Sequence, residues 1–296
     1  MYSDLLFDYL LEGANDFGIE VEQLAQGVKK DRYEIVSDEE SQKFGKPKGK
    51  YELMSIPDVL EMSNMNIEYC AFQLAKTLER LFGKISNKDR ILVVGLGNRY
   101  ISSDSLGVKV AGKIRITIEN KKLPQIMAIC PSVMGLTGIE TVDIIEGVAK
   151  SIGATHLILV DSLCAGSVER LGRSIQATNT GLCPGGGIGN NRKCIDRDIA
   201  KNVFSIGVPL LIYASTFVSG TMESHDIFMD TIMSIMHKYK NNRNNKDILK
   251  FCTSIKQVIN DDVDNLIVSM KDIEEYAEAL SSIIARAINI SLGVDG

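Results

Sequence analysis

The stretch Ile91-Leu-Val-Val-Gly-Leu-Gly-Asn98 decides the fold. Its first four residues are apolar and mostly β-branched, which is typical of a strand buried on both faces of a sheet. Gly95 and Gly97 then interrupt the strand pattern. A helical pattern follows, with an apolar face made of Leu106, Val110, Ala111, Ile114 and Ile118. The order of strand, glycine turn and helix indicates an α/β unit.

The same alternation continues along the chain. Ile126–Cys130, His156–Val160 and Ser205–Ala214 are further apolar runs of strand length, and the capping-box pattern Thr137–Glu140 predicts a helix over Ile139–Ser151. Apolar strands joined by helices are typical of parallel sheets covered on both sides. We therefore predict an α/β fold with a mostly parallel sheet and helices on both faces.

The 296 residues are predicted to form a single domain with three parts. Residues 1–88 are an N-terminal extension packing on the core, and they include an amphipathic helix over Ile67–Phe82 that ends at Gly83. Residues 89–240 are the α/β core that carries the catalytic candidates. Residues 241–296 supply a C-terminal strand and a long helix after Ser269.

Composition excludes several classes of protein. With 45% hydrophobic and 24% charged residues the chain is not disordered, and a net charge of −5 argues against a nucleic-acid partner. No apolar run approaches the ~20 residues that span a membrane, and the N-terminus lacks a basic signal region. We expect a cytoplasmic protein whose six cysteines, which form no Cys-x-x-Cys pair, are reduced thiols that bind no zinc.

Two aspartates are directed to one edge of the predicted sheet. Asp104 lies in the loop after the first strand, and Asp161 directly follows His156–Val160. Ligands of open parallel sheets bind outside the carboxyl ends of the strands. Two facing carboxylates can hold a water, one as general base and one as general acid, because like-charge repulsion separates their pKa values. The alternative is structural: Asp104 caps its helix and Asp161 opens a turn.

Other chemistries have weaker signals. Gly95–Tyr100 is a poor dinucleotide fingerprint, since Tyr100 replaces the third glycine, and leaves only a weak phosphate cradle open. His156 belongs to a buried strand, so none of the three histidines is well placed as a base. The loop Gly181–Asn191 is either a mobile lid or a backbone surface that approaches a ligand, because it contains Gly185, Gly186, Gly187, Gly189 and Asn190.

The chain resembles the spore germination protease family over nearly its whole length. The resemblance lies in Val94–Asn98, Ser103–Gly107, Pro131–Thr141, Leu159–Leu163, Ser167–Arg170, Asn179–Gly181, Pro184–Asn190 and Ile206–Pro209, and it extends to Phe44–Tyr51 and the C-terminal helix. It implies a phosphorylase/hydrolase-like fold, related to the hydrogenase-maturation endopeptidases. It also implies an endopeptidase that degrades small acid-soluble spore proteins in the spore core, acting as a homo-oligomer without nucleic-acid or membrane partners.

The family's two catalytic aspartates fall on Asp104 and Asp161. Gly97 and Asn98, together with the glycine-rich loop, are then substrate-binding or lid residues. The chain departs from the family at Ser102-Ser103, where the family has Thr-Pro, and at Leu210–Ala214, which lacks the family's aspartate. We find no histidine matching the nickel ligand of the maturation enzymes, so we expect a metal-free aspartate mechanism without a cofactor. A metal-dependent maturation-type endopeptidase and a degenerate, non-enzymatic binding module are the alternatives.

The family is made as a zymogen from which a short N-terminal segment is removed. Here Tyr2-Ser-Asp-Leu5 resembles the start of the mature form. We therefore predict that the chain has no substantial pro-segment. The alternative is that Ser3–Asn15 is itself the removable segment.

Overall fold

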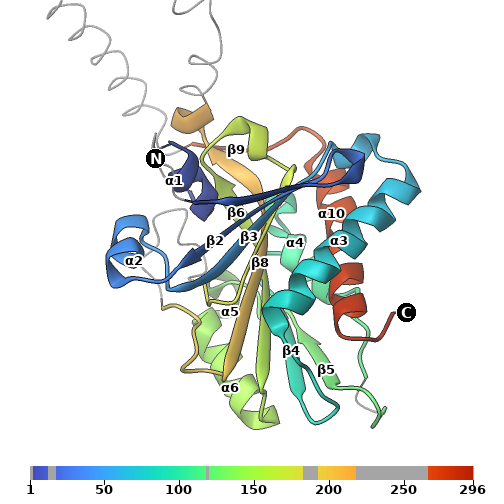
Figure 1. The fold of residues 1–296 in the computed structure, drawn as a ribbon. Helices are drawn as coiled ribbons and strands as arrows, with labels where there is room; N and C mark the ends of the chain where they lie inside the picture. Colours follow the sequence, from blue (N-terminus) through green and yellow to red (C-terminus); the bar gives the residue numbers. More distant parts are fainter. Residues whose placement is uncertain (1–2, 13–17, 118–119, 183–192, 218–265, 296) are drawn as a thin grey trace, which may run out of the picture.

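The fold is built on one large mixed sheet with helices packed against it (Figure 1). The computed structural model describes residues 3–12, 18–117, 120–182, 193–217 and 266–295. The strands lie in the order β1-β2-β3-β7-β8-β6-β4-β5, and β9 pairs with β8. They are β1 (Glu20–Gln23), β2 (Lys29–Ile35), β3 (Gly49–Ser55), β4 (Arg90–Gly95), β5 (Gln125–Ile129), β6 (His156–Ala165), β7 (Ser174–Thr178), β8 (Asn202–Tyr213) and β9 (Ile267–Val268).

The α/β class is confirmed, but the sheet is mixed rather than mostly parallel. Strands β5, β4, β6 and β8 pair in parallel as predicted. The pairings of β1, β2, β3, β7 and β9 are antiparallel. Strand β2 reads Lys-Lys-Asp-Arg-Tyr-Glu-Ile, so a search of the sequence for apolar runs of strand length does not find it.

Alternate residues of β4 enter two cores, because successive side chains of a strand point to opposite faces. Ile91 and Val93 pack with residues of α3 (Asn64–Phe82), α4 (Leu106–Ala111) and α10 (Ile273–Ser291). Leu92 and Val94 pack with residues of α6 (Thr141–Ile152). The other α-helices of the described residues are short: the N-terminal α1 (Leu6–Glu12), α2 (Asp38–Phe44) and α5 (Met134–Thr137).

The predicted helix boundaries are correct where a glycine ends the helix. They are wrong where another hydrogen bond takes up the group that the predicted cap or further helical turn would use. Gly83 and Gly153 adopt positive φ after α3 and α6, as the sequence predicts. Helix α6 begins at Thr141 without a side-chain cap, because the Thr137 hydroxyl accepts the Ile139 N–H instead (3.2 Å). Helix α4 ends at Ala111. Beyond it, the Arg115 N–H donates to the Asn289 side chain of α10, and that side chain donates to the Lys113 main-chain oxygen.

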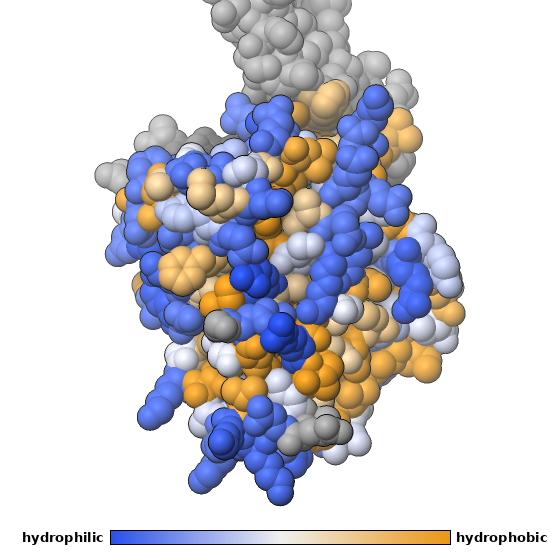
Figure 2. Space-filling model, turned by 90° about the vertical axis from the view of Figure 1, so that its right-hand side faces the viewer, coloured by the Kyte–Doolittle hydropathy of each residue, from blue (hydrophilic) through white to orange (hydrophobic). Residues whose placement is uncertain are grey.

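The side of the molecule that carries α3 and α10 shows hydrophilic residues interspersed with hydrophobic areas (Figure 2). Among the described residues, no helix combines the length and hydrophobicity needed to cross a membrane. Cys70, Cys130 and Cys164 are free thiols, as predicted. Cys194 is disulfide-bonded, which corrects the prediction for that residue, because sequence spacing does not show which cysteines come together in the fold.

The N-terminal segment is built into the molecule through a third core. Four of its side chains, Leu5, Leu6, Phe7 and Leu10, are at most 1% exposed and pack with Ile35, Phe44, Tyr51 and Leu53. Asp8 is buried and accepts the Arg170 Nε–H at 2.6 Å. The Leu6 N–H donates to Gln176 Oε1 of β7 at 2.9 Å. Residues 3–10 therefore form part of the sheet's packing.

Truncating Phe7 tests this third core. Because the ring is 0% exposed, Phe7→Ala should lower the free energy of unfolding by about 3–5 kcal/mol, measured by urea denaturation. Phe72→Ala is the matched control, since Phe72 lies on α3 with 48% of its surface exposed and should lose less than about 1 kcal/mol. Equal losses in the two variants would contradict this account of the N-terminal segment.

Candidate active site

Asp161 lies inside a strand, at the point where that strand loses one neighbour. The sequence places Asp161 directly after a strand, but β6 continues through it to Ala165 because β8 continues beside it. Strand β4 ends at Gly95, opposite Val160. Asp161 is thus the first residue of β6 beyond the end of β4. The prediction that each aspartate follows the end of a strand is correct for Asp104, which follows β4. It is wrong for Asp161, because β6 continues past it.

Asp104 is held by the turn that follows β4. The Asn98 N–H donates both to the Asp104 carboxylate Oδ2 (2.9 Å) and to its main-chain oxygen (3.0 Å). Gly97 has φ +101°, and a Cβ there would stand 2.0 Å from the Asp104 main-chain oxygen. The Asn98 side chain accepts the Tyr100 N–H (3.0 Å) and so shapes the same turn. Gly97 and Asn98 therefore position Asp104, while their contact with substrate stays a prediction.

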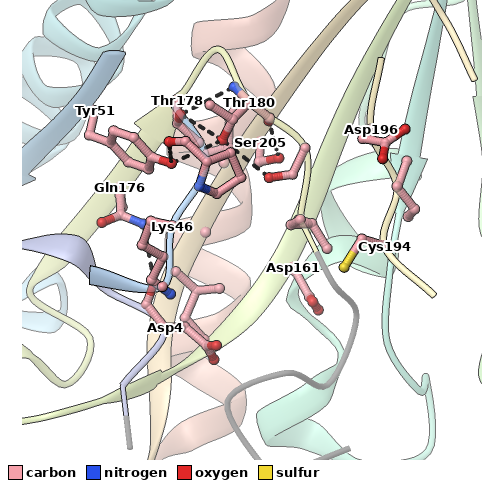
Figure 3. A pocket seen from close by; sticks show the side chains of 18 of the residues that line it. Asp4, Lys46, Tyr51, Asp161, Gln176, Thr178, Thr180, Cys194, Asp196 and Ser205 are labelled. Atoms are coloured by element: carbon pink, nitrogen blue, oxygen red, sulfur yellow. Dashed lines mark hydrogen bonds between the residues drawn. The ribbon is translucent and has the colours of Figure 1, made fainter. Parts of the chain in front are cut away.

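One cavity of about 860 Å³ is lined by both Asp104 and Asp161. Figure 3 shows Asp161 among its lining side chains. Its walls come from the N-terminal segment, the turn after α2, strands β3, β6, β7 and β8, and residues 194–198. Asp161 is only 8% exposed, and its Oδ1 accepts the Ser162 N–H at 2.9 Å. The chain thus converges on the arrangement that the sequence predicts for these two residues.

The two carboxyls differ in how strongly they hold a proton. Burial raises the pKa of Asp104 to about 6, against the opposing effect of the Asn98 N–H. Burial raises the pKa of Asp161 well above its ordinary value, and the nearby charges of Asp104 and Asp4 raise it further. Between the two pKa values Asp104 is ionised while Asp161 keeps its proton. Such a pair has one base and one acid.

Several polar residues of the cavity carry no role in the sequence prediction. Tyr51 donates to the Pro47 main-chain oxygen (2.7 Å), and Ser205 donates to that of Thr180 (2.8 Å). Asp4 and Lys46 lie on the wall beside each other. The signal that could have found them is the resemblance at Tyr2–Leu5 and Phe44–Tyr51, which points to these stretches without saying what their side chains do.

The predicted lid lies outside the described residues from Gly185 to Asn190. Its two flanks are described and line the cavity: Leu182 and Ile195 form an antiparallel bridge, and a Cβ on Gly181 would stand 1.7 Å from the Ile195 main-chain oxygen. Described residues on both sides of the glycine-rich segment therefore line the cavity. Its role as a lid stays a prediction.

Among the described residues, the histidine His156 does not line this cavity. His156 is buried at the start of β6, where its ring contacts Thr155 and Asn202, and burial lowers its pKa. Within the described ranges, no group of three or more His, Cys, Asp or Glu side chains converges as a metal site requires. The expectation of a metal-free mechanism stays a prediction.

The comparison with family models and the comparison with curated relatives agree on one family. The family model described as germination protease matches residues 11–247. A germination protease of Clostridium tetani is 33% identical over 294 residues, covering 93% of this chain and 88% of that protein. The germination protease of Caldanaerobacter subterraneus is 31% identical and covers 92% and 86%, and that of Priestia megaterium is 36% identical and covers 68% and 58%.

Among solved structures, a NiFe hydrogenase maturation protease from Thermococcus kodakarensis aligns with 72% of this chain and 99% of its own. The TM-score is 0.37 and the sequence identity 16%. Similarity at this level carries no inference about the chemistry of the site.

The raised pKa of Asp104 predicts a pH-dependent stability. The folded protein holds the Asp104 proton more tightly than the unfolded chain, so ionisation destabilises the fold as pH rises from about 4 to about 6. Asp104→Asn should therefore be more stable than the parent at pH 7, and this difference should vanish below about pH 4. Urea denaturation at both pH values measures it. Asp198→Asn, at an exposed carboxylate of the same cavity, should show no such difference.

Proposed function

The chain belongs to the germination protease family and is a spore germination endopeptidase, and we propose that it cleaves small acid-soluble spore proteins by water attack assisted by Asp104 and Asp161. The observation that carries the mechanism is the pair of carboxyls in one cavity with different proton affinities. The substrate is the one that the family resemblance implies.

In this mechanism the two aspartates have different roles. Asp104, ionised above about pH 6, accepts a proton from a water held between the carboxyls. The hydroxyl attacks the carbonyl carbon of the scissile peptide bond. Asp161, protonated, donates a hydrogen bond to the carbonyl oxygen and then a proton to the departing amine. Activity therefore rises as pH passes about 6 and falls when Asp161 ionises.

The cavity is large enough and varied enough in its lining to hold a short stretch of peptide. A volume of about 860 Å³ lies at the upper end of the ~300–1,000 Å³ typical of small-molecule sites. Its walls offer hydroxyls of Thr178, Thr180 and Ser205 beside the apolar side chains of Leu163 and Leu211. Such a surface can bind both the backbone and the side chains of an extended chain. Cleavage needs no cofactor, and we propose that the enzyme acts as a homo-oligomer in the cytoplasm of the spore.

Loss of either carboxyl tests the mechanism. Asp104→Asn and Asp161→Asn should each reduce hydrolysis of a small acid-soluble spore protein by about 10²–10⁴-fold, since each removes half of the acid–base pair. The fragments are quantified by mass spectrometry, with folding checked by circular dichroism. Turnover close to that of the parent in either variant would contradict the mechanism. If the parent protein binds the spore protein but does not cleave it, the non-enzymatic alternative is favoured.

The turn at Gly97 gives a second test. A methyl group there collides with the Asp104 main chain, so Gly97→Ala should displace the carboxylate and lower kcat by about 100-fold. Gly147→Ala is the matched control because Gly147 lies in α6 with open space around it and should keep full activity. An active Gly97→Ala enzyme would show that Asp104 does not need this position.

A further inference from the structure

A third carboxyl group shares the cavity of the catalytic pair. Asp4 lines the same cavity as Asp104 and Asp161, although it comes from the N-terminal segment rather than the α/β core (Figure 3). The mechanism above uses only two carboxyls. The presence of Asp4 beside them therefore calls for an explanation of its own.

Asp4 is fixed against the strand that carries Asp161. Its N–H donates to the Cys164 main-chain oxygen at 3.0 Å, and its carboxylate Oδ2 accepts the Cys164 N–H at 2.9 Å. Cys164 follows Asp161 by three residues on β6. This reciprocal pair holds both the main chain and the carboxylate of Asp4 in place at the cavity wall.

A lysine from another element completes the anchorage. Lys46 Nζ donates to the Asp4 main-chain oxygen at 3.0 Å, and burial lowers the pKa of this lysine. The turn that carries it is itself fixed, because the Lys46 N–H donates to the Ser41 main-chain oxygen (3.2 Å) and Tyr51 binds that of Pro47. The Lys46 amine is therefore held at a fixed place beside the Asp4 main chain.

We propose that Asp4 is a positioning residue of the catalytic pair, whose negative charge disfavours ionisation of Asp161 and so keeps Asp161 as the acid. The proposal rests on the function proposed above. Like charges in one desolvated site cannot all ionise, so an added carboxylate favours the protonated form of its neighbour. In line with this, Asp4 is among the charges that raise the pKa of Asp161, after burial and Asp104.

The other charged groups of the cavity do not give the same effect. Within the described residues, only Asp104 and Asp4 act on Asp161 as charges. The remaining titratable or charged groups of the cavity come from the N-terminal segment, the turn after α2, β3, β6 and residues 196–198; they are Tyr9, Lys46, Lys48, Tyr51, Cys164, Asp196, Arg197 and Asp198. Asp198 thus offers a carboxylate of the same cavity without an effect on Asp161.

The test removes the charge of Asp4 and keeps its hydrogen bond. In Asp4→Asn the amide oxygen can still accept the Cys164 N–H. The alkaline limb of the pH profile of kcat/KM should move to lower pH by about one pH unit, while the limb set by Asp104 stays in place. Asp198→Asn should move neither limb. A uniform loss at all pH values, with both limbs in place, would overturn the proposal.

A measurement without substrate separates this inference from the proposed function. Difference infrared titration, with the carboxyl band assigned by Asp161→Asn, reports the protonation of Asp161 directly. Its midpoint should fall in Asp4→Asn and stay in Asp198→Asn; an unchanged midpoint in Asp4→Asn, or an equal fall in both, would overturn the proposal. A shifted midpoint in a protein that cleaves no spore protein would contradict the proposed function alone.

A second variant covers the case in which Asp4→Asn does not fold. Asp4→Ser removes the same charge with a smaller side chain and should therefore lower the Asp161 midpoint, as Asp4→Asn does. A midpoint that stays or rises in Asp4→Ser would overturn the proposal.

Discussion

The site depends on a contact between backbone segments that leaves no room for a side chain. A Cβ on Gly107 would lie 2.3 Å from the Val160 main-chain oxygen, and one on Gly95 would lie 2.1 Å from the main-chain oxygen of Gly107. Real Cβ atoms do not approach other atoms so closely. The start of α4 therefore rests directly on the end of β4 and on the middle of β6, and the loop between β4 and α4 has to deliver Asp104 beside Asp161.

This arrangement places ionisable groups where they are costly. A carboxyl in the middle of a buried strand loses its hydration, and the fold accommodates Asp161 by leaving it protonated rather than by pairing it with a cation. The apolar anchors of the N-terminal segment offset part of this cost. Leu5, Leu6 and Phe7 are each fully buried, which stabilises the fold by roughly 1.5–3 kcal/mol per side chain. Asp161 and the N-terminal segment that stabilises the fold therefore line the same cavity.

How much the sequence predicts depends on how local the deciding signal is. The parallel strands, α3 and the two aspartates follow from apolar runs and from the rule that strand ends meet. Strand β2 does not, because Lys30 and Asp31 are buried in it although they break the apolar pattern. Lys30 donates to the Gln73 main-chain oxygen of the distant α3, and Asp31 pairs with Lys29 of β2 itself. Asp4 is missed for the same reason: its place at the site is set by Cys164 and Lys46, which no pattern near residue 4 reveals.

The N-terminal segment thereby links stability to protonation. It contributes apolar side chains to one core, a wall to the cavity and a carboxylate to the site. If residues 3–10 left their place, Asp104 and Asp161 would remain on the loop and strand that carry them. Asp161 would then gain water from the vacated wall and lose the charge of Asp4, and both changes lower its pKa. Because the two effects have the same sign, docking of this segment favours the protonated form of Asp161.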